Sequence, residues 1–189
     1  MKTVLGAALA VASLLLAPAF AAEVEGVKLA DTVQLGGADL ALNGAGVRTR
    51  VFFKVYVGAL YLQKKAGSAD AVLADAGPKR VAMHLLRDLT AEQLFSALKE
   101  GLADNHSPDQ VAKFEPQVQQ MEKIFFAIKS AKKGDAIMLD YLPRAGTRIV
   151  VNSAEKGTVA GEDFYRALLR IWLGEKPVDA SLKKAMLGG

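Results

Sequence analysis

The residue best suited to chemistry in this chain is Arg48, which follows the glycine-rich segment Asn43-Gly-Ala-Gly and precedes a long apolar stretch. A guanidinium keeps its charge at any workable pH and offers five N–H donors in a fixed fork, which suits a carboxylate, phenolate or enolate oxygen. Tyr56, on the same stretch, offers a neutral hydroxyl. The pair predicts a site for a small anion. The alternative is an arginine that pairs with a structural Asp or Glu, or is solvated at a strand end.

A single long strand, from Val47 to Gln63, is predicted to position both residues. Side chains alternate between the two faces of a strand. The first face carries Arg48, Arg50, Phe52, Lys54 and Tyr56, and the second carries Val51, Phe53, Val55, Val57 and Tyr61. If a helix layer covers the first face, Arg48 and Tyr56 lie in one cleft. A bulge at Gly44 to Gly46 or near Gly58 would reverse the faces locally.

Other familiar catalytic patterns are missing from the sequence. It contains no HExxH, GxxxxGK[ST] or GxSxG segment, so we expect no metal and no cofactor. His84 is interpreted as a packed strand residue. His106 is interpreted as an exposed loop residue, with a role as general base as the alternative. Trp172 lies on an apolar helical stripe and is interpreted as core rather than as a ligand platform.

Composition excludes further classes of protein. The chain has 189 residues, no cysteine and a formal net charge of +4, so neither disulfides nor thiolate chemistry are expected. The excess positive charge is scattered through short lysine pairs such as Lys64-Lys65 and Lys132-Lys133 rather than gathered into a stripe. Nucleic-acid binding is therefore not predicted.

The first 21 residues have the pattern of a signal peptide. Lys2 precedes an apolar run from Val4 to Leu16, and Ala19-Phe20-Ala21 offers small residues for cleavage after Ala21. The run is short for a membrane-spanning helix, although an uncleaved anchor is the alternative. We therefore expect a periplasmic or secreted protein with one domain, residues 22–189, and no integral membrane segment after cleavage.

Local patterns along this domain predict an α+β fold. Strands are expected within 24–42, with a turn at Gly36-Gly37, and at 47–63, 79–86, 136–141 and 147–152, with a last short one from 157, whereas Asn43 to Gly46 is expected to form a tight turn or bulge. Helices are expected at 70–76, 91–103, 108–131 with a kink or break near Pro116, 162–173 and 179–187. A mainly antiparallel sheet covered by helices on one face accounts for this order, and its other face should be more polar.

Four segments together resemble the bacterial chalcone isomerase-like proteins. They are Asn43-Gly-Ala-Gly-Val-Arg48, Lys54-Val-Tyr-Val-Gly-Ala-Leu-Tyr-Leu62, Phe164-Tyr-Arg-Ala-Leu-Leu-Arg-Ile-Trp-Leu-Gly174 and Leu182-Lys-Lys-Ala-Met-Leu-Gly188. The likeness covers essentially the whole of residues 22–189. It implies an open-faced β-sandwich, in which a large antiparallel sheet is covered by a layer of helices and a ligand cleft lies between them.

The resemblance also implies roles for residues of the cleft. In the plant enzymes the arginine after the glycine segment steers a chalcone phenolate into addition to its enone, and Arg48 matches that arginine. A plant threonine aligns best with Tyr56. The plant catalytic tyrosine and asparagine have no clear counterpart, and Asn105 and Tyr141 are only nearby candidates. Fatty-acid-binding members keep an arginine and a tyrosine for a carboxylate, which fits Arg48 and Tyr56 at least as well.

Two functions of different class follow from these observations. The first is an exported protein that binds a small amphipathic anion of fatty-acid or phenolic type through Arg48 and Tyr56, with or without catalysis. The alternative is an isomerase, an intramolecular lyase that cyclises a chalcone-like enone around Arg48. A structural envelope protein that uses the exposed sheet face is a third, weaker interpretation.

Overall fold

The computed structural model describes residues 20–189. Most of the predicted signal peptide, residues 1–21, therefore lies outside the described residues. The first strand, β1 (Phe20–Val24), begins within the last two residues of that predicted peptide. Cleavage after Ala21 stays a prediction. Within residues 20–189 no helix is both long enough and apolar enough to cross a bilayer.

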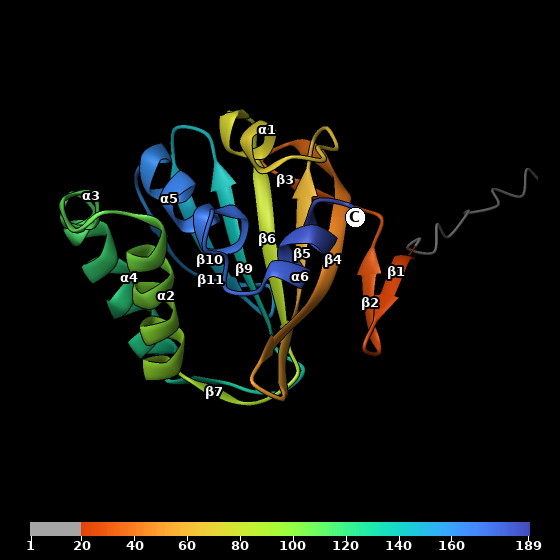
Figure 1. The fold of residues 1–189 in the computed structure, drawn as a ribbon, viewed down its shortest axis with the longest axis horizontal. Coiled ribbons are helices and arrows are strands. Elements are labelled where there is room, and N and C mark those ends of the chain that lie inside the picture. The colour runs from red at the N-terminus through yellow and green to blue at the C-terminus, as the bar shows by residue number, and fades with distance from the viewer. Residues whose placement is uncertain (1–19) are drawn as a thin grey trace, which may run out of the picture.

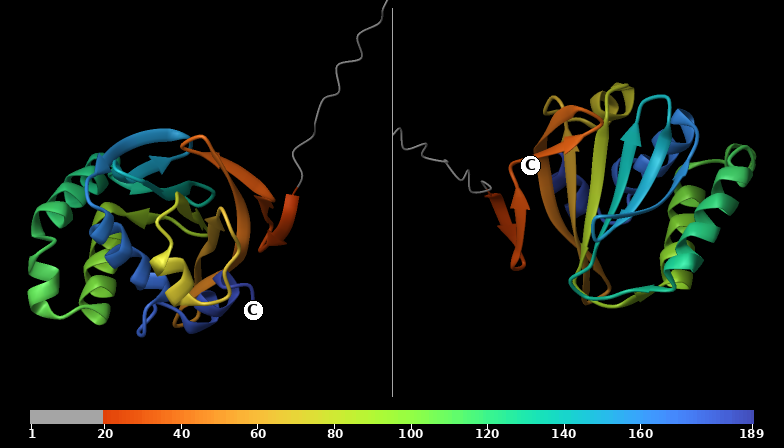
Figure 2. Two further views of the ribbon diagram at one scale, coloured as in Figure 1. Left: turned by 90° about the horizontal axis from the view of Figure 1, so that it is seen from above. Right: turned by 180° about the vertical axis from the view of Figure 1, so that it is seen from behind.

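A seven-stranded antiparallel sheet forms the body of the molecule (Figure 1). In spatial order its strands are β11 (Ala154–Val159), β10 (Gly146–Val151), β9 (Ala136–Leu142), β6 (Lys79–Leu85), β5 (Phe53–Leu62), β4 (Ala38–Arg50) and β3 (Thr32–Leu35). Two small sheets accompany it, β1 with β2 (Val27–Ala30) and β7 (Leu89–Thr90) with β8 (Ser130–Ala131). Seen from above, the large sheet curls into an arc whose open side holds helices (Figure 2).

The helices cover one side of this arc. They are α1 (Ala69–Ala74), α2 (Ala91–Asn105), α3 (Pro108–Ala112), α4 (Glu115–Ile128), α5 (Glu162–Leu173) and α6 (Ala180–Met186). Thr90 and Ser107 form the expected capping boxes with Gln93 and Gln110. The predicted helix 108–131 is divided into α3 and α4, and Pro116 lies in the first turn of α4, where its missing N–H costs nothing. The α+β fold predicted from the sequence is confirmed.

The main core lies between the concave face of the sheet and the helices. The predicted stripe of α5, Phe164, Leu168, Ile171 and Trp172, is buried there. On β6, Val81, Met83 and Leu85 face this core, and Ala82 faces away from it, as strand alternation requires. Helices and sheet therefore bury one another's apolar faces, and the sheet is held with one surface toward the helix layer.

The convex face of the sheet is not uniformly polar, so that prediction was wrong in part. A second apolar cluster lies there, including Leu40, Val57 and Tyr61, and residues of the β1–β2 hairpin pack against it. Toward the other edge the face is charged, because the buried Asp140 binds Arg80 and Arg148 on the two neighbouring strands. The sequence pattern did not reveal that the N-terminal hairpin would cover this face.

The segment from Val47 to Gln63, predicted as a single strand, is in fact divided by a turn into the two strands of a β-hairpin. β4 ends at Arg50, Val51 and Phe52 form the turn, and β5 begins at Phe53. Two-residue hairpin turns normally contain Gly, Asn or Asp, because one or both turn residues adopt positive φ. Val51 adopts a φ of 58° without any such sequence signal, which is why the turn was missed.

The segment Asn43 to Gly46 is part of β4 and not a tight turn, although the bulge expected as the alternative is present at Asn43. Its glycines serve close packing. A Cβ on Gly44 would overlap the carbonyl oxygen of Ala185 in α6, and one on Gly46 would lie 2.7 Å from the Ala185 Cβ. The Asn43 side chain donates to the carbonyl of Met186 at 2.7 Å and so binds the end of α6. The small residues therefore allow α6 to lie directly on the hairpin.

Replacement of Gly44 by alanine should separate α6 from the sheet. We expect Gly44→Ala to lower the free energy of unfolding by about 1–3 kcal/mol, because the added methyl group meets backbone rather than a movable side chain. Urea denaturation measures this loss. Gly67→Ala is the matched control, since nothing lies within 4 Å of a Cβ there. Equal stability of the two variants would contradict the close approach.

Candidate functional site

The β4–β5 hairpin places Arg48 directly opposite Tyr56. The two residues are cross-strand partners, and the Arg48 guanidinium carbon lies 5.5 Å from the centroid of the Tyr56 ring. Cross-strand partners point to the same face of a sheet, and this face is turned toward the helices. The sequence predicted that Arg48 and Tyr56 share a face, but the reason is strand pairing rather than alternation along one strand.

A register shift next to this pair brings a further side chain to the same face. Arg48 pairs with Tyr56 but Thr49 pairs with Lys54, so Val55 is an extra residue on β5. Such a bulge re-aims side chains locally. Val55 and Tyr56 are consecutive, yet both are buried in the helix-facing core.

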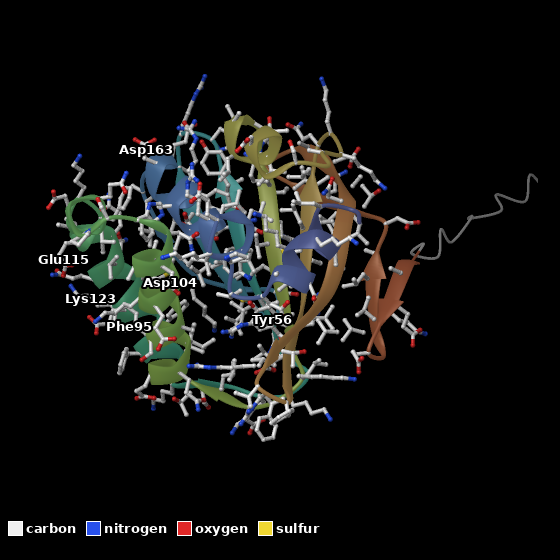
Figure 3. The ribbon with its side chains drawn as sticks, viewed as in Figure 1. Tyr56, Phe95, Asp104, Glu115, Lys123 and Asp163 are labelled. Atoms are coloured by element: carbon white, nitrogen blue, oxygen red, sulfur yellow. The ribbon has the colours of Figure 1, made fainter. Side chains whose placement is uncertain are left out.

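These residues line a cavity of about 250 Å³ between the hairpin and the helices. Tyr56 lies on the helix side of the sheet near α6 (Figure 3). The wall formed by the strands carries Arg48, Arg50, Val51, Phe53, Val55, Tyr56, Met83 and Leu139. The opposite wall and the ends carry Arg87, Leu89, Gln93, Leu94, Ala97, Leu98, Phe125, Ile171, Trp172 and Val178. Among the residues that the structure describes, this lining is mainly apolar, contains three arginines and contains no aspartate or glutamate.

Arg48 has no carboxylate partner in the part of the chain that the structure describes. None of the ion pairs among residues 20–189 includes it, and its buried Nε has no hydrogen-bond partner. Asp179 lies nearby, but its carboxylate accepts from the backbone N–H groups of Thr49, Ser181 and Leu182. The alternative of a structural ion pair is therefore not what the structure shows, and the guanidinium keeps donors for an anion.

Tyr56 adds a neutral donor next to this cation. Its hydroxyl oxygen accepts a hydrogen bond from Trp172 Nε1 at 2.8 Å, which leaves its own proton free to donate. Burial raises the pKa of Tyr56 to about 12, although the charge of Arg48 and the Trp172 hydrogen bond both oppose this rise. The hydroxyl is therefore protonated at neutral pH. Together Arg48 and Tyr56 can offer a positive fork and an O–H donor to the same oxygen-bearing group.

Helix α6 fixes the end of the cavity near these donors. The helix lies against Gly44, Gly46 and Gly58, where added Cβ atoms would meet Ala185 or Leu182. Its N-cap residue, Asp179, binds the backbone N–H of Thr49 at 2.9 Å, and the preceding Val178 lines the cavity. The glycines before Arg48, which were predicted to form a turn, therefore contribute to the site indirectly. They allow α6 to pack closely against β4.

Several residues of the cavity were not predicted from the sequence. Trp172 is core, as expected, but it also orients the Tyr56 hydroxyl, and no spacing in the sequence links two residues so far apart. Arg87 follows β6 and reaches the cavity from a loop that has no distinguishing motif. Arg50 shares the predicted face of Arg48, so strand alternation was a usable signal for it.

The other candidates lie away from the cavity. Asn105 ends α2, where its amide binds the backbone of Gly101 and Lys176. Tyr141 stacks on Tyr165, with ring centroids 4.9 Å apart. His106 is the C-cap of α2, and its Nε2 lies 3.3 Å from the carbonyl of Ala167. Neither candidate for the plant tyrosine and asparagine therefore joins Arg48.

Two further observations concern titratable groups. His84 is half-buried on β6, and burial lowers its pKa. Within residues 20–189, no three His, Cys, Asp or Glu side chains gather in a way that could hold a metal ion.

The fold and the cavity define a class of protein, an α+β open-faced sandwich with an arginine-bearing apolar cavity between its curled sheet and its helices. The sequence profile of the family described as chalcone isomerase-like matches residues 21–188. The chain belongs to the chalcone isomerase-like family. Among solved structures, it is similar to the fatty-acid binding protein AtFAP1 of Arabidopsis thaliana, with a TM-score of 0.68 and 15% sequence identity, over 87% of this chain and 95% of that chain. No curated protein sequence matches the chain.

The buried hydroxyl of Tyr56 should make stability depend on pH in the alkaline range. Its pKa of about 12 exceeds the ordinary value of 10.0, so its contribution is complete below pH 10 and is lost as the pH rises through 12. Between about pH 9 and about pH 11, the wild-type protein should lose about 1.4 kcal/mol more unfolding free energy than Tyr56→Phe. Urea titrations at the two pH values measure the difference. Equal losses would show that the hydroxyl is solvated.

Proposed function

We propose that this protein binds a small amphipathic anion, of fatty-acid or phenolic type, in the cavity between hairpin and helices. The observation that supports this most directly is Arg48, a half-buried cation without a carboxylate partner among residues 20–189, on the wall of a cavity whose lining contains no acid. A charge taken partly out of water needs an anionic partner. A ligand anion would be that partner.

The two halves of such a ligand match the two parts of the cavity. A carboxylate or phenolate oxygen would accept from the Arg48 guanidinium and from the Tyr56 hydroxyl, and hydrogen bonds to charged groups are the stronger kind. The Trp172 N–H would keep the Tyr56 hydroxyl oriented so that its proton points away from the indole. An apolar tail or ring would lie against side chains such as Leu98, Phe125 and Ile171.

The class of ligand is supported by the kind of lining as well as by the similar structure. The polar groups of the cavity are concentrated in the arginines, Tyr56, Gln93 and Trp172, and the rest is aliphatic or aromatic. AtFAP1 is a fatty-acid binding protein with the same fold, which is compatible with a carboxylate-headed ligand here. At 15% identity the likeness supports the fold, and the ligand is inferred from this chain's own cavity.

The proposal includes export. The positive start, apolar run and small-residue end of residues 1–21 favour a signal peptide, and a domain without cysteine needs no disulfide to fold outside the cytoplasm. A periplasmic or secreted binder of an amphipathic anion would shield the apolar part of its ligand from water. Detection of a chain that begins at Ala22 in the exported fraction would support this part of the proposal.

An intramolecular lyase is the second candidate, because a cation next to a neutral O–H donor also stabilises an oxyanion that forms during a reaction. In a chalcone-like enone, the phenolate oxygen would add to the alkene and leave an enolate that takes up a proton. Arg48 would position the phenolate, and Tyr56 is protonated and so can donate rather than accept a proton. Within residues 20–189 the lining offers no His, Asp, Glu or Lys as a base, so the substrate would have to enter as its phenolate. This favours binding over catalysis as the main function.

Removal of the Arg48 charge should weaken binding of a fatty carboxylate without unfolding the protein. We expect Arg48→Met to weaken the binding of dodecanoate by roughly 10- to 150-fold, the worth of a hydrogen bond to a charged group. Tyr56→Phe should weaken it by about 1 kcal/mol. Isothermal titration calorimetry measures both values, and the thermal midpoint checks the fold.

The matched control for this experiment is Arg170→Met. Arg170 is exposed on α5, does not line the cavity and makes no side-chain hydrogen bond within residues 20–189, so its loss should leave the affinity unchanged. Dodecanol is the matched ligand, since it keeps the tail and lacks the charge. If dodecanol bound as tightly as dodecanoate, or if Arg48→Met bound dodecanoate normally, Arg48 would not be the anion site.

Catalysis is tested separately by following chalcone absorbance. If the protein only binds, the absorbance of a 2′-hydroxychalcone should fall at the spontaneous rate in its presence. A faster fall that disappears in Arg48→Met would establish the isomerase instead. A faster fall that persists in Arg48→Met would place the reaction outside this cavity.

A further inference from the structure

The turn of the β4–β5 hairpin exposes three consecutive apolar residues. The exposed fraction is 77% for Val51, 91% for Phe52 and 62% for Phe53. In the part of the chain from 20 to 189, Phe126 is the other large hydrophobic residue that is exposed. Scattered exposed hydrophobics are ordinary, but three in a row at a projecting turn indicate an interaction site.

The conformation of this turn makes its sequence unusual. Val51 has a φ of 58°, whereas Phe52 does not have positive φ. Positive φ at the first of two turn residues is typical of a type II′ turn, in which glycine normally takes that position. A β-branched residue is strained there. A turn that served only to connect two strands would be more stable with a small polar pair, so the apolar side chains point to a further role for this turn.

Basic residues surround the exposed turn. Arg50 and Lys54 flank it in sequence, and the Arg87 guanidinium carbon lies 5.3 Å from the centroid of the Phe53 ring. Arg50 and Lys54 pair with Glu100 and Glu25, respectively. Because the side chains of both pairs are accessible to solvent, these ion pairs contribute little to stability. Arg50 and Lys54 can therefore exchange their glutamate partners for other anions. An apolar tip within a basic collar suits the interface of a bilayer that contains anionic lipids.

The same turn borders the cavity. Val51 and Phe53 contribute to the cavity lining, whereas Phe52 does not. Figure 1 shows the β4–β5 turn at the lower end of the sheet, beside β7. The register places the β9–β10 turn at the opposite end, since Lys79 pairs with Leu62 and with Tyr141. A surface that contacted the tip would therefore also lie next to the cavity.

We propose that residues 51–53 insert into the interfacial region of an anionic lipid bilayer, with Arg50, Lys54 and Arg87 contacting lipid phosphates. A single hairpin turn is small for a stable protein–protein interface, but it is sufficient as a wedge between headgroups. Docking in this way would place the cavity against a source of amphipathic anions. That consequence rests on the proposed function, whereas the docking itself does not.

Vesicle co-sedimentation of the purified protein tests the proposal. Wild-type protein should bind vesicles that contain phosphatidylglycerol and bind phosphatidylcholine vesicles much more weakly. Phe52→Ser should weaken binding to the anionic vesicles by roughly 10- to 100-fold, because it removes the most exposed ring of the tip. Arg50→Gln should weaken it less, and Arg144→Gln, in the turn at the far end of the sheet, should leave it unchanged.

A second variant separates loss of vesicle binding from loss of the fold. Val51→Gly combined with Phe52→Asn supplies residues that the turn prefers, so it should raise the thermal midpoint while it abolishes vesicle binding. Phe52→Ser should still bind dodecanoate in solution, which separates failure of docking from failure of the cavity. Vesicle binding by Phe52→Ser at the wild-type level would overturn the proposal. So would a wild-type protein that ignores vesicles and instead forms a dimer dependent on Phe52.

Discussion

An arginine that is half withdrawn from water without a carboxylate partner is the constraint on which this structure depends. Desolvation of a cation is unfavourable, and proteins usually offset it with a nearby carboxylate. Here the Tyr56 ring lies 5.5 Å from the Arg48 guanidinium carbon, and the Asp179 carboxylate accepts from backbone N–H groups instead. A cation–π contact recovers only part of the cost. The cavity therefore combines an unpaired positive charge with apolar side chains around it, and this combination is what the proposed amphipathic anion would match.

The rest of the hairpin holds this arrangement in place. Strand pairing sets Arg48 opposite Tyr56, and the extra residue Val55 turns one more apolar side chain into the cavity. Gly44 and Gly46 let α6 approach so closely that its N-cap, Asp179, meets the backbone of Thr49. Trp172, from α5, holds the Tyr56 hydroxyl. Four separate segments thus position two donors, so the site depends on tertiary packing and not on any one motif.

This dependence explains how much of the protein could be predicted from its sequence. The helices after Thr90 and Ser107 were predictable because their caps are local, and the α5 stripe because its period is helical. Arg48 and Tyr56 were predicted as site residues from their chemical types and the family resemblance, and the structure places both in the lining of one cavity. The hairpin was missed because Val51 and Phe52 lack the usual turn chemistry, and the role of Gly44 was misassigned because its reason for being small lies in α6. Trp172 and Arg87 reach the cavity from segments far from Arg48 in the sequence. Local sequence patterns do not show such long-range contacts.

The turn of the β4–β5 hairpin, which was not predicted from the sequence, also links the cavity to the surface. Val51 and Phe53 are exposed, yet both line the cavity that contains Arg48. Any apolar surface that covered them would exclude water from the mouth of the cavity and lower the local dielectric constant. The attraction between Arg48 and a bound carboxylate would then strengthen, because Coulomb energy varies inversely with the dielectric constant. Contact at the tip and retention of an anion in the cavity would therefore be coupled through the hairpin itself, without a conformational change.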